Sequence, residues 1–218
     1  MSGKYNETAM RSMGIMNAGW GICGITATFY AMYQLNPGVR GALVNAPRPF
    51  SVLAEIKSYL QMLKAAGATR ELDDIKAFTR AFGKVGKDDF SNFTIDGYIA
   101  YINAAAQKYA NTGPERDAEI TSDGMFSIAL PPMAVADYVS RIWGWRASVS
   151  DADQGGDAII GVKSSDNWFN NFRLYKGLVH WVYRKNGQIY SWGNAPVDSL
   201  AKASSDFEFR WSIKVAPP

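Results

Sequence analysis

The chain has 218 residues, with 23 basic and 20 acidic side chains, and its net charge of +3 is too small to indicate a nucleic-acid partner. Hydrophobic residues make up 47% of it, as in a globular protein with a sizeable core, and no run of about 18 apolar residues predicts a membrane span. One cysteine and one histidine exclude an intramolecular disulfide and the usual four-ligand zinc site, so we expect no metal and no cofactor.

The first half of the sequence predicts helices. Residues 1–16 are polar with scattered methionines and lack the basic-then-apolar build of a secretory signal, which favours a short helix or loose lead-in and cytoplasmic synthesis. A helix is expected to run to about Leu35, where Asn36-Pro37-Gly38 would end it. Apolar residues at steps of three and four predict further helices from Ser51 to about Gly67, from there to Gly83, from Thr94 to about Gly113, and from Pro131 to Gly144.

After Gly144 the pattern changes to short β-prone stretches bounded by glycine, asparagine and aspartate. The predicted strands are 146–150, 158–164, 172–174, 178–184, 188–192 and 207–215. Helices followed by an antiparallel sheet define an α+β fold. We therefore expect a single domain over 1–218, with a mainly helical lobe at 1–144 and a β-sheet lobe at 145–218.

The only cysteine, Cys23, is the first candidate for chemistry. Gly21 and Gly24 flank it and allow a tight turn, and Ile22, Ile25 and Phe29 follow helical spacing. This pattern predicts a glycine-rich loop that presents the thiol on the first turn of a buried helix. A helix N-terminus stabilises a thiolate and lowers its pKa, which is one way to make a cysteine nucleophile. The alternative is a small buried side chain with a packing role only.

The only histidine, His180, lies on a predicted hairpin strand, and Asn194 lies beyond the turn on the other arm. A three-residue Lys185-Asn186-Gly187 loop would place both side chains on one face, whereas a two-residue Asn186-Gly187 loop would place Asn194 on the opposite face. Both loops suit the sequence. A Cys–His–Asn mechanism requires the first, unless a bulge intervenes.

In the first arrangement Asn194 would orient the imidazole of His180, whose other nitrogen would accept the proton of Cys23. Asp198 has the same parity and is the alternative orienting residue. The competing interpretation is a half-buried strand histidine that only satisfies its hydrogen bonds.

The Gly21-Ile22-Cys23-Gly24 loop running into Ala27-Thr28-Phe29-Tyr30 resembles the nucleophile loop and helix of papain-like cysteine peptidases. The order Cys, His, Asn and the helical lobe before a β lobe are also similar to that family. The resemblance implies that Asn17, six residues before the cysteine, takes the place of the family's oxyanion-binding glutamine. Trp192 resembles the family's tryptophan, although it precedes Asn194 here.

The resemblance covers two short segments and the lobe order. One departure from the family's pattern is that Gly24 follows the cysteine in place of the family's usual residue. It implies a hydrolase that cleaves a peptide, isopeptide or peptidoglycan cross-bridge bond through a thioester. Glutamine deamidation and transglutamination use the same residues and stay open. Among disulfide-free members of this kind are bacterial effectors, so the resemblance also raises export by a specialised secretion system as an effector or toxin, with any inhibitor or immunity partner unknown.

A function of another class also stays open. Aromatic residues make up 13% of the chain, and many of them lie in the predicted sheet half, as a non-catalytic binding module would require. Aromatic packing between sheet and helices explains the same pattern without a ligand. No strongly amphipathic basic helix favours a membrane-active toxin.

Overall fold

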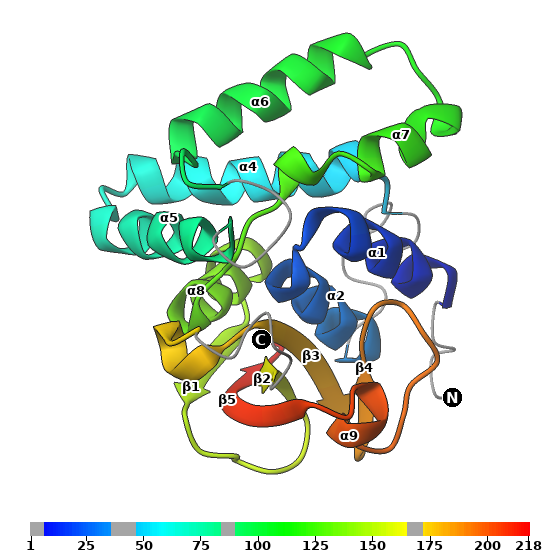
Figure 1. Cartoon of the computed structure of the whole chain (residues 1–218), viewed down its shortest axis with the longest axis vertical. Coiled ribbons are helices and arrows are strands. Elements are labelled where there is room, and N and C mark those ends of the chain that lie inside the picture. The colour runs from blue at the N-terminus through cyan, green and yellow to red at the C-terminus, as the bar shows by residue number, and fades with distance from the viewer. Residues whose placement is uncertain (1–6, 36–46, 84–89, 165–171) are drawn as a thin grey trace.

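The structure, a computed structural model, describes residues 7–35, 47–83, 90–164 and 172–218. The predicted turn at Asn36-Pro37-Gly38 lies outside these ranges. Within them the fold is α+β, with helices in the first part of the chain and an antiparallel sheet in the second (Figure 1). The helices are α1 (Glu7–Trp20), α2 (Cys23–Leu35), α4 (Pro49–Ala65), α5 (Thr69–Gly83), α6 (Ile95–Lys108), α7 (Asp117–Thr121), α8 (Pro132–Trp143) and α9 (Leu200–Ala203).

One five-stranded sheet contains the described strands, in the order β1-β5-β2-β3-β4, and every neighbouring pair is antiparallel. The strands are β1 (Arg146–Ser150), β2 (Ala158–Ser164), β3 (His180–Lys185), β4 (Gln188–Tyr190) and β5 (Phe207–Ala216). The strand predicted at 172–174 is wrong. Arg173 has αR backbone angles, φ −117° and ψ −19°, and Leu174 begins a 3-10 turn, η3 (Leu174–Gly177), in which Tyr175 and Lys176 are left-handed.

Several helix boundaries differ from the prediction. The helix expected to be capped by Ser51 begins at Pro49, because proline is well suited to the first helical position and Arg48 precedes it in extended conformation. The cap at Thr94 is confirmed, since its hydroxyl accepts a hydrogen bond from the Gly97 N–H. At the first helix the difference matters for function, since α1 continues to Trp20, into the stretch predicted as loop.

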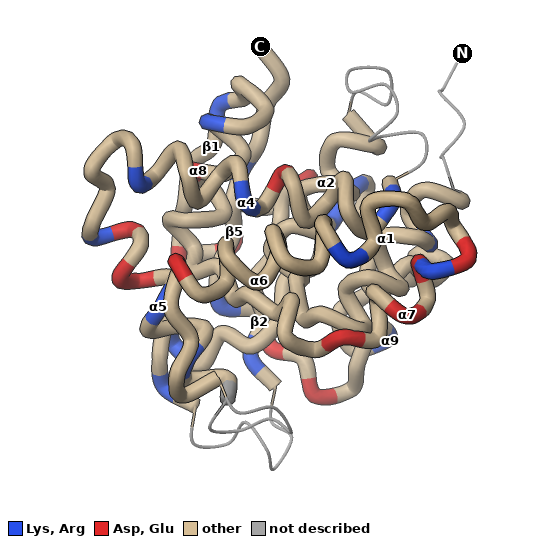
Figure 2. The backbone as a smooth tube through the Cα atoms, turned by 90° about the horizontal axis from the view of Figure 1, so that it is seen from above, with Lys and Arg blue, Asp and Glu red and all other residues tan. Residues whose placement is uncertain are grey.

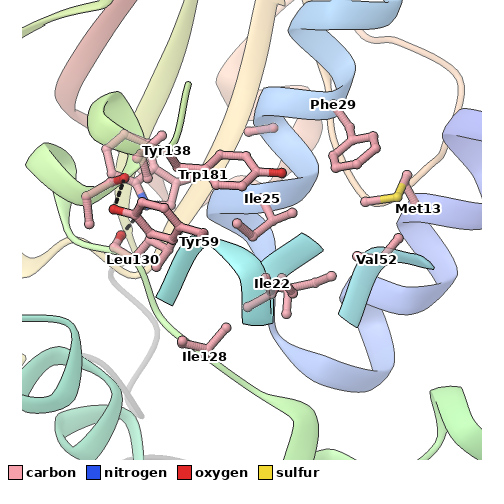
Figure 3. Close-up of a cluster of buried hydrophobic side chains, with 14 of the residues drawn as sticks. Met13, Ile22, Ile25, Phe29, Val52, Tyr59, Ile128, Leu130, Tyr138 and Trp181 are labelled. Carbon is pink, nitrogen blue, oxygen red and sulfur yellow. Dashed lines mark hydrogen bonds between the residues drawn. The ribbon is translucent and has the colours of Figure 1, made fainter. Parts of the chain in front are cut away.

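The helix that begins at Cys23, α2, belongs to a layer of helices next to the sheet. Figure 1 shows α4, α5, α6 and α7 on the side away from the sheet, with α1, α2 and α8 between them and the strands. Every residue of α2 from Gly24 to Tyr33 is buried. The Trp181 indole N–H, on β3, donates to the Leu130 carbonyl at 3.0 Å, and both side chains lie beside α2 (Figure 3). This contact fixes β3 against the extended segment that leads into α8.

Charged residues of both signs are interspersed along the described chain (Figure 2), so neither lobe is distinguished by a block of one charge. Most ion pairs between described residues are exposed, and some of them join separate elements, such as Arg48 with Asp117 at 2.9 Å. Exposed pairs of this kind contribute at most about 1 kcal/mol each, so burial of apolar surface holds the fold together. No helix in the described ranges combines the length and the apolar character needed to span a bilayer.

Candidate functional site

The turn between α1 and α2 places the thiol. The helix α1 ends at Trp20, and Gly21 adopts a left-handed φ of 63° while its N–H donates to the Asn17 carbonyl at 2.8 Å. Glycine tolerates this conformation without strain. The chain then re-enters a helix at Cys23, the first residue of α2, as the sequence predicted. Cys23 is partly buried, with no disulfide.

Cys23 and His180, 157 residues apart in the sequence, line the same cavity of about 200 Å³. Cys23 comes from the start of α2 and His180 from the start of β3. Asn17 from α1 and Trp192 from beyond β4 also line it. The rest of the lining comes from the turn before α2, the last part of α5, Phe90, the segment before α8, and β3 with the two residues that precede it: Gly21, Phe78, Thr79, Phe82, Phe90, Ser127, Ile128, Ala129, Leu130, Leu178, Val179 and Trp181.

The imidazole of His180 is held on two sides. Its Nε2 lies 2.9 Å from the Ser191 hydroxyl oxygen, and the indole of Trp192 stacks on the ring with centroids 4.2 Å apart and planes inclined by 9°. His180 is 8% exposed. In the tautomer whose Nε2–H donates to Ser191, the Nδ1 lone pair is left to accept a proton from another group.

Ser191 therefore takes the position for which the sequence proposed Asn194. The hairpin turn is the two-residue Asn186-Gly187 loop, with φ of 49° and 78°, and Lys185 pairs with Gln188. This is the register that places Asn194 on the wrong face, because positive φ at both central residues gives the primed turn that matches strand twist.

Past β4 the chain leaves the sheet. Trp192 and Gly193 both have positive φ, 49° and 70°, and Asn194 is exposed. Asn194 lines shallow hollows that do not include His180. The alternative orienting residue, Asp198, is exposed and pairs with Lys202 at 2.6 Å. The sequence does contain a candidate for this role, the Ser191 hydroxyl next to Trp192 on the same hairpin arm, and the prediction overlooks it.

Burial dominates the acid–base properties of the pair. It raises the pKa of the Cys23 thiol to about 11, although the backbone N–H groups of Trp181, Gly24 and Cys23 itself oppose this. The sequence predicts that the helix N-terminus lowers this pKa, and in the structure the desolvation of the buried thiol is the larger effect. Burial also lowers the pKa of His180 to about 3. Both groups are neutral at neutral pH.

Asn17 lies in the last turn of α1 and is 4% exposed. Its side-chain oxygen has no hydrogen-bond partner among the described residues, although the side chain lines the cavity. A buried amide oxygen without a partner costs about 1–3 kcal/mol, so a ligand N–H that donates to this oxygen gains binding energy, whereas a ligand oxygen could pair only with the amide nitrogen. Within the described residues no three His, Cys, Asp or Glu side chains gather as possible metal ligands.

We compared the chain with protein-family models, with curated proteins and with solved structures, and none of them matched. The case for a function accordingly depends on the geometry of this cavity.

Proposed function

We propose that this protein is a cysteine hydrolase of papain-like build that cleaves an amide bond in a peptide or peptide-like substrate. The observation that carries the proposal is the shared cavity of Cys23 and His180, the only cysteine and the only histidine of the chain. If Cys23 and His180 had only structural roles, nothing would require the fold to bring them from separate lobes to the same cavity. Thiol hydrolysis needs a nucleophile and a base that share one cavity, and the proposed reaction brings the two groups within hydrogen-bond reach when substrate binds.

In the proposed reaction, Nδ1 of His180 takes the proton of the Cys23 thiol as the sulfur attacks the substrate carbonyl carbon. The electron pair of the C=O bond moves to oxygen, and the resulting oxyanion is stabilised by the Asn17 amide and the N–H of Cys23. That N–H belongs to the first residue of α2 and has no intrahelical partner. The C–N bond breaks, the amine leaves with the imidazolium proton, and water then hydrolyses the thioester.

The resting state proposed here is a neutral thiol beside a neutral imidazole. Since the pKa of Cys23 is raised and that of His180 lowered, proton transfer accompanies the attack, as in serine hydrolases, and does not precede it. A substrate that fills the cavity would place its carbonyl oxygen at the Asn17 amide nitrogen. The negative charge that develops on this oxygen during the attack would then be stabilised. We therefore expect substrate-like electrophiles to react better than simple alkylating agents.

The character of the cavity limits the substrate. Its wall is largely aromatic and aliphatic, with Phe78, Phe82 and Leu178 among its members, and the lining residues within the described ranges include no Asp, Glu, Lys or Arg. An apolar or aromatic side chain next to the scissile carbonyl is favoured there, because a charged side chain buried in this cavity would lack an ion-pair partner.

The test is mass spectrometry of a denatured protein mixture treated with the wild-type chain, Cys23→Ala and His180→Gln. We expect new peptide ends with the wild type only. A small mass gain at glutamine without cleavage would indicate deamidation, and covalently joined peptides would indicate transglutamination. Product formation by Cys23→Ala equal to that of the wild type would rule out the thiol mechanism and would favour the binding-module alternative.

A further inference from the structure

A second cavity adjoins the one that contains Cys23. It has a volume of about 220 Å³ and lies between the start of α6 and the segment before α8. Met125 is 54% exposed and Tyr101 36% exposed, so the rim of this cavity is open to solvent. The lining residues are Phe90, Asn92, Phe93, Thr94, Gly97, Tyr98, Tyr101 and Met125.

Two features join the cavities. Phe90 lines both of them. The segment 125–130 also runs from one to the other: Met125 lines the second cavity, and Ser127 to Leu130 line the first. Between them Phe126 is buried, and its ring lies 5.0 Å from that of Tyr101. A chain lying along this segment would meet both hollows in turn.

We propose that the second cavity is a distal subsite for an apolar or aromatic side chain of an extended polypeptide substrate, occupied while another residue of the same substrate lies at Cys23. This inference rests on the proposed function, from which it takes the orientation of the substrate toward the thiol. Residues 126–130 span about 13 Å when extended at 3.3 Å per residue, so the two anchoring side chains are expected about three to five residues apart.

The chemistry of the rim favours a neutral or cationic occupant. The Asp123 carboxylate accepts hydrogen bonds from the Tyr101 hydroxyl and from the Met125 N–H, the latter at 3.1 Å. Asp96, on α6, forms an ion pair with Lys64, so its charge is compensated. The Asp123 carboxylate beside the lining residues disfavours anionic ligands such as phosphates, and the aromatic rings inside suit a methionine, leucine or phenylalanine side chain.

The experiment measures binding of the full chain carrying Cys23→Ala to Gly/Ser peptides that contain two phenylalanines at increasing separations. We expect affinity about 10-fold above that of single-phenylalanine peptides at separations of about three to five residues, since a second buried ring is worth more than 1.4 kcal/mol. The variant Met125→Glu should abolish this gain. Met133→Glu, a change at a 63% exposed methionine of α8 that lines neither cavity, should retain it.

Affinity that is independent of separation, or a gain that survives Met125→Glu, would overturn the subsite. Loss of a dimer in Met125→Glu, measured by light scattering, would overturn it as well, by assigning the cavity to a second copy of the chain. Failure of the proposed function has a different signature: separation-dependent binding with Cys23→Ala, but no cleavage of the same peptides by the wild type.

Discussion

The Ser191 hydroxyl oxygen lies 2.9 Å from Nε2 of His180, and this contact joins the end of one hairpin arm to the start of the other. The next residue, Trp192, covers the imidazole face. Two consecutive residues thus hold the ring in its plane, and when the Ser191 hydroxyl accepts from Nε2–H the other nitrogen, Nδ1, is left as a proton acceptor. A serine hydroxyl orients an imidazole through a neutral hydrogen bond, which is weaker than a bond to a carboxylate and leaves the low pKa of His180 in place.

Ser191→Ala should therefore impair turnover more than binding. Loss of one neutral hydrogen bond and release of the ring should lower kcat about 10-fold to 100-fold with KM nearly unchanged. Steady-state kinetics on a peptide substrate measure the effect, and Ser191→Thr should restore part of the rate because it keeps the hydroxyl.

Asn194→Ala is the matched control, since Asn194 is exposed and the structure gives its expected role to Ser191. We expect wild-type kcat from this variant. The opposite result, a large loss with Asn194→Ala and none with Ser191→Ala, would restore the arrangement that the sequence predicted and would require a different conformation of residues 191–194 during the reaction.

Gly14→Ala should disturb the site from outside it. A Cβ at this position of α1 would meet the backbone of Trp192 and Gly193 well inside van der Waals contact. Alanine normally stabilises a helix by about 1 kcal/mol relative to glycine, so a loss here would have to come from this contact. We expect destabilisation of about 1–3 kcal/mol and a fall in kcat as Trp192 moves off His180.

Urea unfolding and kinetics on the same preparation separate the two effects of Gly14→Ala. The control is Ile15→Ala, one residue along on α1, where the side chain is 56% exposed and little change is expected. If Gly14→Ala were more stable than the wild type and fully active, α1 and the turn at Trp192 would not be packed as closely as described.

The sequence allowed prediction of elements that local chemistry determines. The strands 146–150 and 158–164, the Thr94 cap and the position of Cys23 on the first turn of a helix all follow from side-chain periodicity and caps. The boundary at Pro49 was missed although proline at a helix start is a local signal, because the hydroxyl of Ser51 offered a competing cap.

Features that depend on packing between segments far apart in the chain could not be predicted from the sequence. The sequence predicts a glycine-rich loop before Cys23, yet Gly19 lies in the last turn of α1, where an added Cβ would clash with the Thr121 carbonyl. The raised pKa of Cys23 depends on its burial in the folded chain, and the backbone N–H of Trp181, far away in the sequence, opposes that shift. The hairpin register was left open between two loops, and the twist preference of Asn186-Gly187 would have favoured the observed one.

The raised pKa of Cys23 predicts an unusual alkylation profile. Iodoacetamide reacts with the thiolate, and with a pKa of about 11 in place of 9.0 the thiolate fraction near pH 8 should be about 100-fold below that of an ordinary cysteine. The rate, followed by intact mass, should still be rising between pH 9 and pH 11.

The same chain unfolded in guanidinium is the control for alkylation, and its rate should be half-maximal near pH 9 and level off above about pH 10. A folded-state rate that already levelled off below pH 7 would mean that Cys23 and His180 rest as a thiolate–imidazolium pair, contrary to the neutral pair proposed here.

The low pKa of His180 predicts acid sensitivity of the fold. In the unfolded chain the imidazole binds a proton near pH 6.5, whereas burial holds its folded pKa at about 3. Above pH 6.5 the group is neutral in both states and adds no pH dependence. As the pH falls from 6.5 toward 3, only the unfolded state gains the proton, so the free energy of unfolding should fall by up to about 4 kcal/mol.

His180→Gln should lose this component while keeping the acid response of the carboxylates, such as Asp153, whose pKa is lowered to about 2 by Arg184. Urea unfolding of both proteins at several values between pH 7 and pH 4 gives the difference directly, because the carboxylate contributions cancel. We expect the wild type to lose stability faster than the variant over this range. Parallel curves would mean that the imidazole is solvated in the folded protein, and the enclosed site proposed for Cys23 and His180 would have to be abandoned.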